Sequence, residues 1–244
     1  MQSVFSIKNK VIIVTGVSSG IGKYLANKLV SYGAIVYGFS RKKIKKVNYN
    51  NIQCDLSDNI QLKKVIRKIY SKHKKISVLV NNAGITKEAK NLDENLSSFD
   101  EVININTKIP IMISNMCFKY MKKKDNCSII NICSLASKLG FPNNTSYVAS
   151  KGALSQATKS LALDFSKKNI RVNNILPGYI KTRMTIKSFK SKKKYNLRKD
   201  RTMLNRWGSP KDILGAVIFL SSESSNYVTG SDVIVDGGWS SKGL

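Results

Sequence analysis

The sequence contains few acidic residues. Asp and Glu account for 14 of its 244 residues, against 42 Lys and Arg, which gives a formal net charge of +28. Clustered Lys and Arg neutralise phosphates, so this charge raises the question of nucleic-acid binding. The basic runs at 41–46 and 192–194 lack the interleaved aromatic residues on which bases stack. Because Lys, Asn and Ile are abundant along the whole chain, as an AT-rich coding sequence would produce, we interpret the lysines as solvated surface and expect no nucleic-acid partner.

Histidine, cysteine and long apolar runs are also scarce. With His73 as the single histidine, a metal site of several histidines is excluded, and we predict no metal site. The four cysteines show no C-x-x-C spacing, which favours reduced thiols over a disulfide scaffold. No run approaches the roughly 18 apolar residues of a membrane span, and residues 1–5 lack the charged start of a signal peptide. We therefore expect a cytoplasmic protein without membrane contact.

Short β-branched runs alternate with longer segments of helical periodicity. The expected strands are 11–14, 34–39, 76–80, 128–132, 170–175 and 232–235. The expected helices are 21–32, 59–73, 99–121 with a bend near Pro110, 146–168 and 212–221. A hydrophobic fraction of 42% is enough for one sizeable core. The alternation predicts an α/β fold: a single doubly wound, Rossmann-type parallel sheet with helices on both faces, in one domain over residues 1–244.

A glycine-rich loop follows the first expected strand and opens the first helix. Gly16 permits a tight turn, while Gly20 and Gly22 let the backbone approach a phosphate and let the helix pack on the strand. The free N–H groups of the helix N-terminus suit a pyrophosphate. The spacing G-x-x-x-G-x-G differs from the common dinucleotide fingerprint. The loop alone is therefore compatible with a dinucleotide site and with a plain glycine-rich turn.

The end of the second strand indicates which dinucleotide fits. An acidic residue there binds the ribose 2′-OH of NAD, and a basic residue fits the 2′-phosphate of NADP. The chain has Ser40 and Arg41 at this point and no Asp or Glu before Asp55. We predict NADP, with NAD as the less favoured cofactor; the alternative is that Arg41 is one more surface cation.

Tyr147 and Lys151 are four residues apart in an expected helix and so share one face. An ammonium beside a phenol favours the phenolate and lowers the tyrosine pKa from its usual value near 10. A tyrosine tuned in this way can give or take a proton. Ser134 ends the fourth strand, at the carboxyl edge where ligands of such sheets bind, and its hydroxyl could polarise a carbonyl oxygen. Ser137 and Ser146 are competing candidates.

These motifs occur in one order and spacing along the chain. They are Thr15-Gly16-x-x-x-Gly20-x-Gly22, Asp55, Asn81-Asn82-Ala83-Gly84, Asn106, Ser134, Tyr147-x-x-x-Lys151, Pro177-Gly178-x-x-x-Thr182 and Asp236-Gly237-Gly238. Together they make the chain resemble the short-chain dehydrogenase/reductase family over essentially its whole length. One departure is Ser19, because many NADP-using members have a basic residue there, which leaves the 2′-phosphate to Ser40 and Arg41.

The resemblance implies roles for individual residues. Tyr147 would be the general acid/base, Lys151 would lower its pKa and bind the nicotinamide ribose, Ser134 would hold the substrate oxygen, and Asn106 would anchor a water in a proton relay. Asn81 would brace the central sheet. The predicted cofactor-binding residues are Gly16, Ser18, Ser19, Gly20, Ile21, Gly22, Ser40, Arg41, Asp55, Leu56, Asn82, Ala83, Gly84, Tyr147, Lys151, Pro177, Gly178, Ile180 and Thr182. A homotetramer is implied as well.

The basic stretch 181–206 falls where the family keeps a mobile substrate lid. Arg183, Arg201 and Arg206 are its strongest candidates for binding an anion, and Lys187, Lys190 and Arg198 are further ones. The leading hypothesis is an NADP-dependent oxidoreductase that interconverts an alcohol and a ketone on a small hydroxy or keto substrate, such as a sugar acid. One alternative is a 3-oxoacyl-[acyl-carrier-protein] reductase. Another, from a different class, is a non-catalytic nucleotide-sensing or nucleic-acid-binding protein.

Overall fold

The computed structural model describes residues 3–87, 89–123 and 126–243. In this part of the chain one parallel sheet has seven strands, in the order β3-β2-β1-β4-β5-β6-β7. The strands are β1 (Val11–Thr15), β2 (Ile35–Ser40), β3 (Asn50–Gln53), β4 (Val78–Asn81), β5 (Ser128–Ile132), β6 (Arg171–Pro177) and β7 (Asp232–Val235). The order runs outward from β1 in one direction and from β4 in the other, which confirms the predicted doubly wound sheet.

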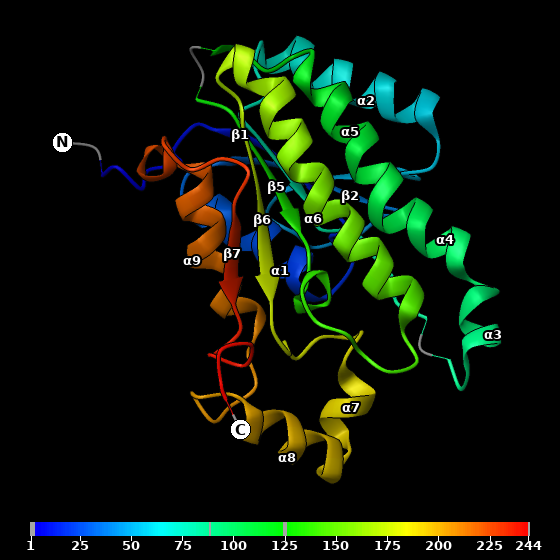
Figure 1. Cartoon of the computed structure of the whole chain (residues 1–244). Helices are drawn as coiled ribbons and strands as arrows, with labels where there is room; N and C mark the ends of the chain where they lie inside the picture. Colours follow the sequence, from blue (N-terminus) through cyan, green and yellow to red (C-terminus); the bar gives the residue numbers. More distant parts are fainter. Residues whose placement is uncertain (1–2, 88, 124–125, 244) are drawn as a thin grey trace.

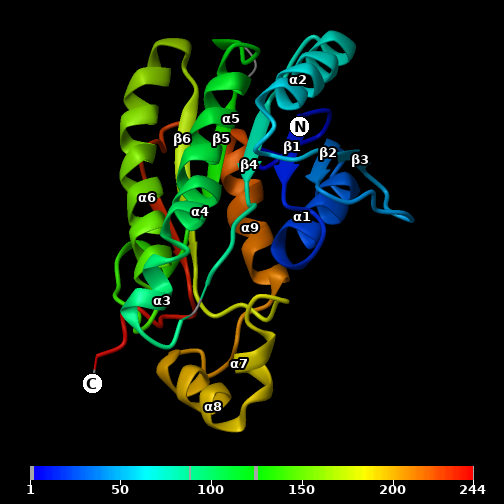
Figure 2. The same ribbon diagram turned by 90° about the vertical axis from the view of Figure 1, so that its right-hand side faces the viewer.

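Helices cover both faces of the sheet, as Figures 1 and 2 show. Helices α2 (Asn59–His73), α4 (Phe99–Ile103), α5 (Ile109–Phe118) and α6 (Thr145–Phe165) lie on one face. Helices α1 (Gly20–Ser31) and α9 (Pro210–Ser221) lie on the other. The short helix α3 (Leu92–Leu96) precedes α4. None of the helices in the described ranges is long and apolar enough to span a membrane.

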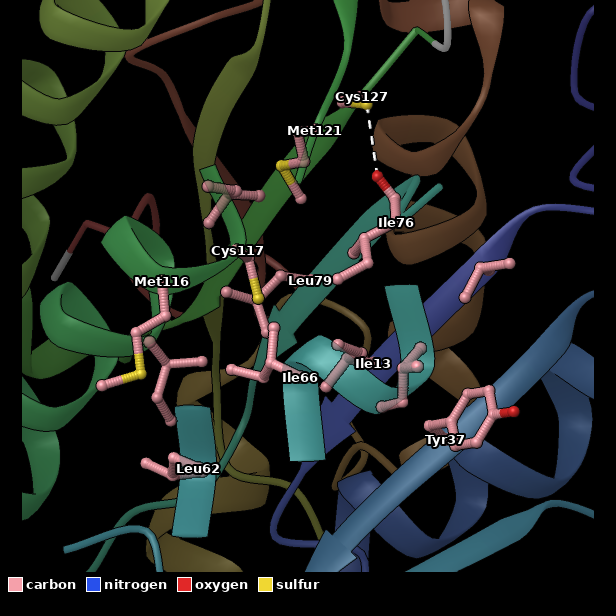
Figure 3. Packing of buried hydrophobic residues seen from close by; sticks show 14 of the residues in the cluster. Ile13, Tyr37, Leu62, Ile66, Ile76, Leu79, Met116, Cys117, Met121 and Cys127 are labelled. Atoms are coloured by element: carbon pink, nitrogen blue, oxygen red, sulfur yellow. Dashed lines mark hydrogen bonds between the residues drawn. The ribbon is translucent and has the colours of Figure 1, made fainter. Parts of the chain in front are cut away.

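The core consists of two apolar layers separated by the sheet. Ile13 of β1 and Leu79 of β4 face one layer, where they meet Ile66 of α2 and Cys117 of α5 (Figure 3). Ile12, next along β1, faces the opposite layer with α1 and α9. Because successive side chains of a strand point to opposite faces, a sheet covered on both sides requires nearly continuous apolar strands. This requirement explains the Val/Ile-rich runs of the sequence.

The strand β3 was not predicted. Its sequence, Asn50–Gln53, is polar, and it lies at one edge of the sheet, where β2 is its strand partner. Asn50 Nδ2 donates to the carbonyl of Val36 at 3.1 Å, and Asn51 Nδ2 donates to that of Gly38 at 3.3 Å. Side-chain amides thus reinforce the pairing with β2, so the strand forms without the apolar pattern that marks the central ones.

The long helix expected over 99–121 is interrupted, but not at Pro110. Between α4 and α5 the chain makes a π-helical turn, η1 (Asn104–Lys108), in which the N–H of Ile109 donates to the carbonyl of Asn104. Pro110 occupies the first turn of α5, where a missing N–H costs little. The irregularity therefore belongs to Asn104–Lys108, and π turns of this kind are frequent at functional sites.

The carboxyl ends of the strands lie along one edge of the sheet, and the segment 181–206 lies beyond them. This segment has weak periodicity in the sequence, yet it folds into α7 (Ile186–Lys190) and α8 (Lys192–Arg201). Figures 1 and 2 both show these two helices past the tips of the strand arrows. A cavity between this edge and α7–α8 is the expected place for a ligand of such a sheet.

Candidate active site

A cavity of about 860 Å³ lies at the carboxyl edge of the sheet. Its walls come from the loops that follow β1 to β6, from α6, and from the segment 181–206. All the residues predicted to bind cofactor or to act in catalysis line this cavity, except Gly22 and Asn106. Residues from distant parts of the chain thus converge as the motifs predicted.

The glycine loop is pressed against the end of β4. Gly16 has a φ of +73°, and a side-chain carbon at this position would lie 2.8 Å from the Cα of Ala83. A side-chain carbon on Gly22, inside α1, would lie 2.3 Å from Nδ2 of Asn82. Gly22 therefore serves the cavity indirectly, by letting the helix approach the β4 loop. Both positions require glycine for steric reasons.

Thr15 and Asn82 fix the loop by hydrogen bonds. Thr15 Oγ1 accepts from the backbone N–H groups of Asn82 and Ala83, each at 3.0 Å. Asn82 Nδ2 donates to the carbonyls of Thr15 and Gly16, at 2.9 and 3.2 Å. The N-terminus of α1 has no side-chain cap and no acidic residue in its first turn. The free N–H groups at the start of α1 and the glycine loop before it thus form a cradle at the cavity. This cradle fits the pyrophosphate of a dinucleotide.

The cavity wall after β2 combines a cation with two oriented polar groups. Arg41 lines the cavity beside Asp55, and its positive charge contributes to lowering the pKa of the Asp55 carboxyl. The larger causes of that lowered pKa are hydrogen bonds from the Ser57 backbone and hydroxyl to Asp55 Oδ1, at 2.9 and 2.7 Å. The Ser40 hydroxyl donates to the Lys42 carbonyl at 2.6 Å.

Tyr147 and Lys151 share one face of α6 and both line the cavity, as their spacing predicts. Lys151 is 4% exposed, and its Nζ donates to the carbonyl of Ile132, the last residue of β5, at 2.8 Å. Nζ lies 6.0 Å from the centroid of the Tyr147 ring. The lysine is therefore anchored to the strand end, beside the phenol.

The prediction that Lys151 lowers the pKa of Tyr147 is wrong for this structure. Burial raises the pKa of the phenol above its ordinary value, and the hydrogen bond with Ser134 partly opposes this effect. Burial also lowers the pKa of Lys151, because desolvation disfavours its charged form. With the ammonium directed to the Ile132 carbonyl, the Ser134 hydroxyl is the group that eases ionisation of the phenol.

The structure distinguishes between the three candidate serines. Ser134 lines the cavity, and its Oγ accepts from the N–H of Ala136 at 3.1 Å. Ser137 instead donates from its hydroxyl to the backbone carbonyl of Lys151 at 3.0 Å. Ser146 is fully buried. Of the three, only Ser134 lines the cavity and also lowers the pKa of Tyr147.

Asn106 lies behind the cavity wall. It is fully buried in η1; its Oδ1 accepts from the N–H of Ile85 at 2.8 Å, and its Nδ2 donates to the Ile85 carbonyl at 2.8 Å and to the Ser150 hydroxyl at 3.0 Å. A side-chain carbon on Gly84 would lie 3.1 Å from Asn106 Oδ1 and 3.6 Å from Lys151 Nζ. The amide therefore clamps the loop after β4 to the residue that precedes Lys151.

Comparison with known proteins shows which family the chain belongs to. A family model described as enoyl-(acyl carrier protein) reductase matches residues 16–240. The chain is 35% identical to the 3-oxoacyl-[acyl-carrier-protein] reductase of Thermotoga maritima, over 95% of this chain and 98% of that protein. It is 33% identical to the 5-keto-D-gluconate 5-reductase of Escherichia coli K12, over 98% of each. The chain belongs to the short-chain dehydrogenase/reductase family. It is an oxidoreductase of that family.

A solved short-chain dehydrogenase/reductase has nearly the same fold. The gluconate 5-dehydrogenase from Burkholderia cenocepacia J2315, in complex with NADP and tartrate, superposes with a TM-score of 0.90 at 27% identity, covering 98% of both chains. The NADP of that complex is a dinucleotide, the class of ligand that the cradle between β1 and α1 fits in this chain.

Two of the three arginines predicted as the strongest anion binders do not line the cavity. Arg206 makes two hydrogen bonds to Asp212, at 2.7 and 3.0 Å, and so is already paired with a carboxylate. Arg201 lies over the ring of Trp239, 4.4 Å from its centroid. Arg183 does line the cavity, together with Arg198 of the wider predicted set.

Several residues of the site escaped sequence analysis. Thr15 stands inside the glycine motif, but its hydroxyl bonds to the β4 loop depend on strand order rather than on spacing. Ser150 precedes Lys151, yet its partner Asn106 is 44 residues away. Phe141 and Tyr179 give the cavity an aromatic wall, with ring centroids 6.4 Å apart. Tyr179 follows the Pro177-Gly178 motif, which is the one signal that could have identified it.

Proposed function

We propose that this enzyme transfers a hydride between NADP(H) and a secondary alcohol or ketone, with Tyr147 as the general acid/base. The observation that carries the proposal is the convergence of Ser134, Tyr147 and Lys151 on one cavity that also receives the glycine loop. A phenol whose ionisation a serine hydroxyl favours, beside a buried lysine, is suited to move one proton to or from a substrate oxygen.

Each of these side chains has a separate task. Ser134 Oγ donates a hydrogen bond to the substrate oxygen and holds it near Tyr147. In ketone reduction the Tyr147 hydroxyl gives its proton to that oxygen, and in alcohol oxidation the phenolate accepts it. Lys151, anchored on Ile132, supplies hydrogen-bond donors beside the phenol, and Asn106 would support a proton relay with it. Bound NADP(H) supplies or accepts the hydride.

The cofactor would be held along the whole sheet edge. The N-terminal amides of α1 would bind the pyrophosphate, and Asp55 with Leu56 would face the adenine. Ser40 and Arg41 would bind the 2′-phosphate, which favours NADP over NAD. Thr182 lies against the glycine loop, since a side-chain carbon on Gly20 would be 3.3 Å from its Cβ. Thr182 and Ile180 would fix the nicotinamide carboxamide.

The substrate we propose is a small hydroxy or keto acid of the sugar-acid type. The similarity to a 5-keto-D-gluconate 5-reductase and to a gluconate 5-dehydrogenase supports this class. The similarity to a 3-oxoacyl-[acyl-carrier-protein] reductase supports a second candidate, reduction of an acyl thioester. The test measures NADPH oxidation through the absorbance of NADPH. We expect oxidation with 5-keto-D-gluconate and none with acetoacetyl thioesters. Turnover of the thioester alone selects the second candidate, and turnover of neither contradicts the proposed substrates.

We further propose that the chain works as a single domain, with 181–206 as a substrate lid, and assembles into a homotetramer in the cytoplasm. A surface groove of about 550 Å³ along η1, α5 and α6, lined by Ile111, Met112 and Leu161, supports association through these helices. Three of the cysteines, Cys54, Cys117 and Cys133, are free and buried thiols, which supports a reducing compartment. Sedimentation equilibrium tests the tetramer, and a monomer at micromolar concentration contradicts it.

A further inference from the structure

The segment 181–206 places in the cavity wall an arginine whose hydrogen-bonding capacity the protein leaves unused. Arg198 of α8 lines the cavity, and its Nη1 is buried without a hydrogen-bond partner among the residues that the structure describes. Buried charged donors without acceptors are costly, so those found in folded proteins call for an explanation, and a ligand is one. We propose that the Arg198 guanidinium binds the carboxylate of the substrate and thereby selects hydroxy acids over neutral hydroxy compounds. This proposal rests on the proposed function and names the substrate class.

Aromatic rings hold the guanidinium in a defined position. Its Cζ lies 4.3 Å from the centroid of the Tyr179 ring and 5.9 Å from that of Trp207. The two rings are themselves 5.5 Å apart in an edge arrangement. A guanidinium stacked on a ring keeps its N–H groups in its own plane, free to form the paired hydrogen bonds that a carboxylate accepts. The position is therefore built before a ligand arrives.

Arg198 lies at the reacting end of the cavity. Tyr179, on which it stacks, also lines the cavity and lies close enough to Tyr147 to contribute to raising the pKa of that phenol. Tyr179 follows β6, whereas Arg41 follows β2, and β1, β4 and β5 lie between these two strands. A group bound to Arg198 is therefore on the substrate side, away from the position proposed for the 2′-phosphate.

The charges around Arg198 favour an anion. Arg183 and Lys194 line the same cavity. Among the described residues that line the cavity, Asp55 is the only acidic one, and its carboxylate accepts hydrogen bonds from Ser57 after β3, at the opposite end of the sheet edge. A carboxylate here meets positive charge without a competing acid. A 3-oxoacyl thioester presents no carboxylate to Arg198, so this arrangement favours the sugar-acid class.

The test is a binding measurement that needs no turnover. The complex of the enzyme with NADPH is titrated calorimetrically with D-gluconate, and separately with D-glucitol, which carries an alcohol in place of the carboxylate. D-gluconate, D-glucitol and NADPH are all reduced compounds. No hydride can therefore move between probe and cofactor during the titration. Wild type is compared with Arg198→Met, with Arg198→Lys, and with Arg201→Met as the matched control. Arg201 is on the same helix and also stacks on a tryptophan, but it does not line the cavity.

We expect wild type to bind D-gluconate more tightly than D-glucitol. Arg198→Met should weaken D-gluconate binding by about 10- to 100-fold, which is the usual contribution of hydrogen bonds between charged groups. The affinities for D-glucitol and NADPH should stay within about twofold of those of wild type. Arg198→Lys should show an intermediate loss of D-gluconate affinity, because lysine keeps the positive charge but lacks the planar pair of N–H donors. Arg201→Met should match wild type.

Five results would each overturn the proposal. The first is an unchanged D-gluconate affinity in Arg198→Met. The second and third are a loss of D-glucitol affinity in Arg198→Met, or of D-gluconate affinity in Arg201→Met, as large as the loss of D-gluconate affinity in Arg198→Met. The fourth is a loss of NADPH affinity in Arg198→Met, which would show a cofactor contact instead. Wild type without a preference for D-gluconate overturns it too. The NADPH absorbance assay stays separate: absence of hydride transfer with every hydroxy compound contradicts the proposed function, while the titration still decides the role of Arg198.

Discussion

Asn106 Nδ2 donates to the hydroxyl of Ser150 at 3.0 Å, and this bond connects the π turn η1 to the helix that carries Tyr147 and Lys151. The same amide holds both backbone groups of Ile85, at the start of the loop beside the glycine turn. One buried side chain thus sets the distance between the proposed cofactor cradle and the proposed acid/base. The amide lies in the π turn, and π turns of this kind are frequent at functional sites.

We therefore expect Asn106→Ala to lower kcat by about 10- to 100-fold with little effect on NADPH affinity, since hydrogen bonds of this kind position Lys151 rather than contact the cofactor. Ser150→Ala should lower kcat as well. Because both changes break the same bond, their effects on kcat should be clearly less than additive in the double variant. Additive losses would show that the two residues act independently.

The role of Arg41 is tested by cofactor preference. Arg41→Ala should weaken NADPH binding by about 10- to 100-fold, because a charge-assisted contact to the 2′-phosphate is lost, and leave NADH binding within about twofold. Lys43→Ala is the matched control, as this neighbouring lysine is exposed and does not line the cavity. Fluorescence titration with each reduced cofactor gives both constants. Equal losses for NADPH and NADH would contradict a 2′-phosphate contact.

Two helix glycines allow a matched steric test. A side-chain carbon on Gly22 would come within 2.3 Å of Asn82 Nδ2, whereas one on Gly215 in α9 meets nothing within 4 Å. We expect Gly22→Ala to displace the Asn82 amide from the glycine loop and to weaken NADPH binding by about tenfold or more. Gly215→Ala should leave binding unchanged and raise the free energy of unfolding by about 0.5–1 kcal/mol, through helix propensity. A larger loss of NADPH binding in Gly215→Ala than in Gly22→Ala would refute the role given to Gly22.

The pH dependence follows from the direction of the Tyr147 pKa. Burial raises this pKa above its ordinary value, because desolvation favours the protonated phenol. Ketone reduction, which needs the protonated phenol, should be constant near neutrality and fall as the pH rises through that pKa; alcohol oxidation should rise instead. Since the Ser134 hydrogen bond lowers the pKa, Ser134→Ala should shift both profiles to higher pH, besides lowering the rate. Unshifted profiles of kcat against pH would contradict this link.

The sequence predicts those parts of the fold that local patterns determine. The central strands are apolar because both faces of the sheet are covered, and the glycine loop follows from steric limits at Gly16 and Gly22. The edge strand β3 depends on Asn side chains that bond to β2, and the π turn depends on the tertiary bonds of Asn106. Neither leaves a periodic pattern in the sequence.

The same limit applies to the arginines of the segment 181–206. Arg206 is paired with Asp212, which also caps α9 through Ser209, and only the path of the chain after α8 brings the two charges together. Arg198 and Arg201 are three residues apart on α8, yet one lines the cavity and the other lies over Trp239. Charge composition predicts a basic segment here, but the fold decides which of its cations can reach a ligand.

Proton transfer by Tyr147 is tested most directly by Tyr147→Phe, which removes one oxygen and keeps the ring. The measurement is kcat for 5-keto-D-gluconate reduction, with NADPH affinity determined by titration on the same preparation. We predict that kcat falls by about 100- to 10,000-fold, as expected for loss of a general acid, while the dissociation constant of NADPH stays within about twofold. A variant that binds NADPH normally and keeps more than about a tenth of wild-type kcat would contradict the account.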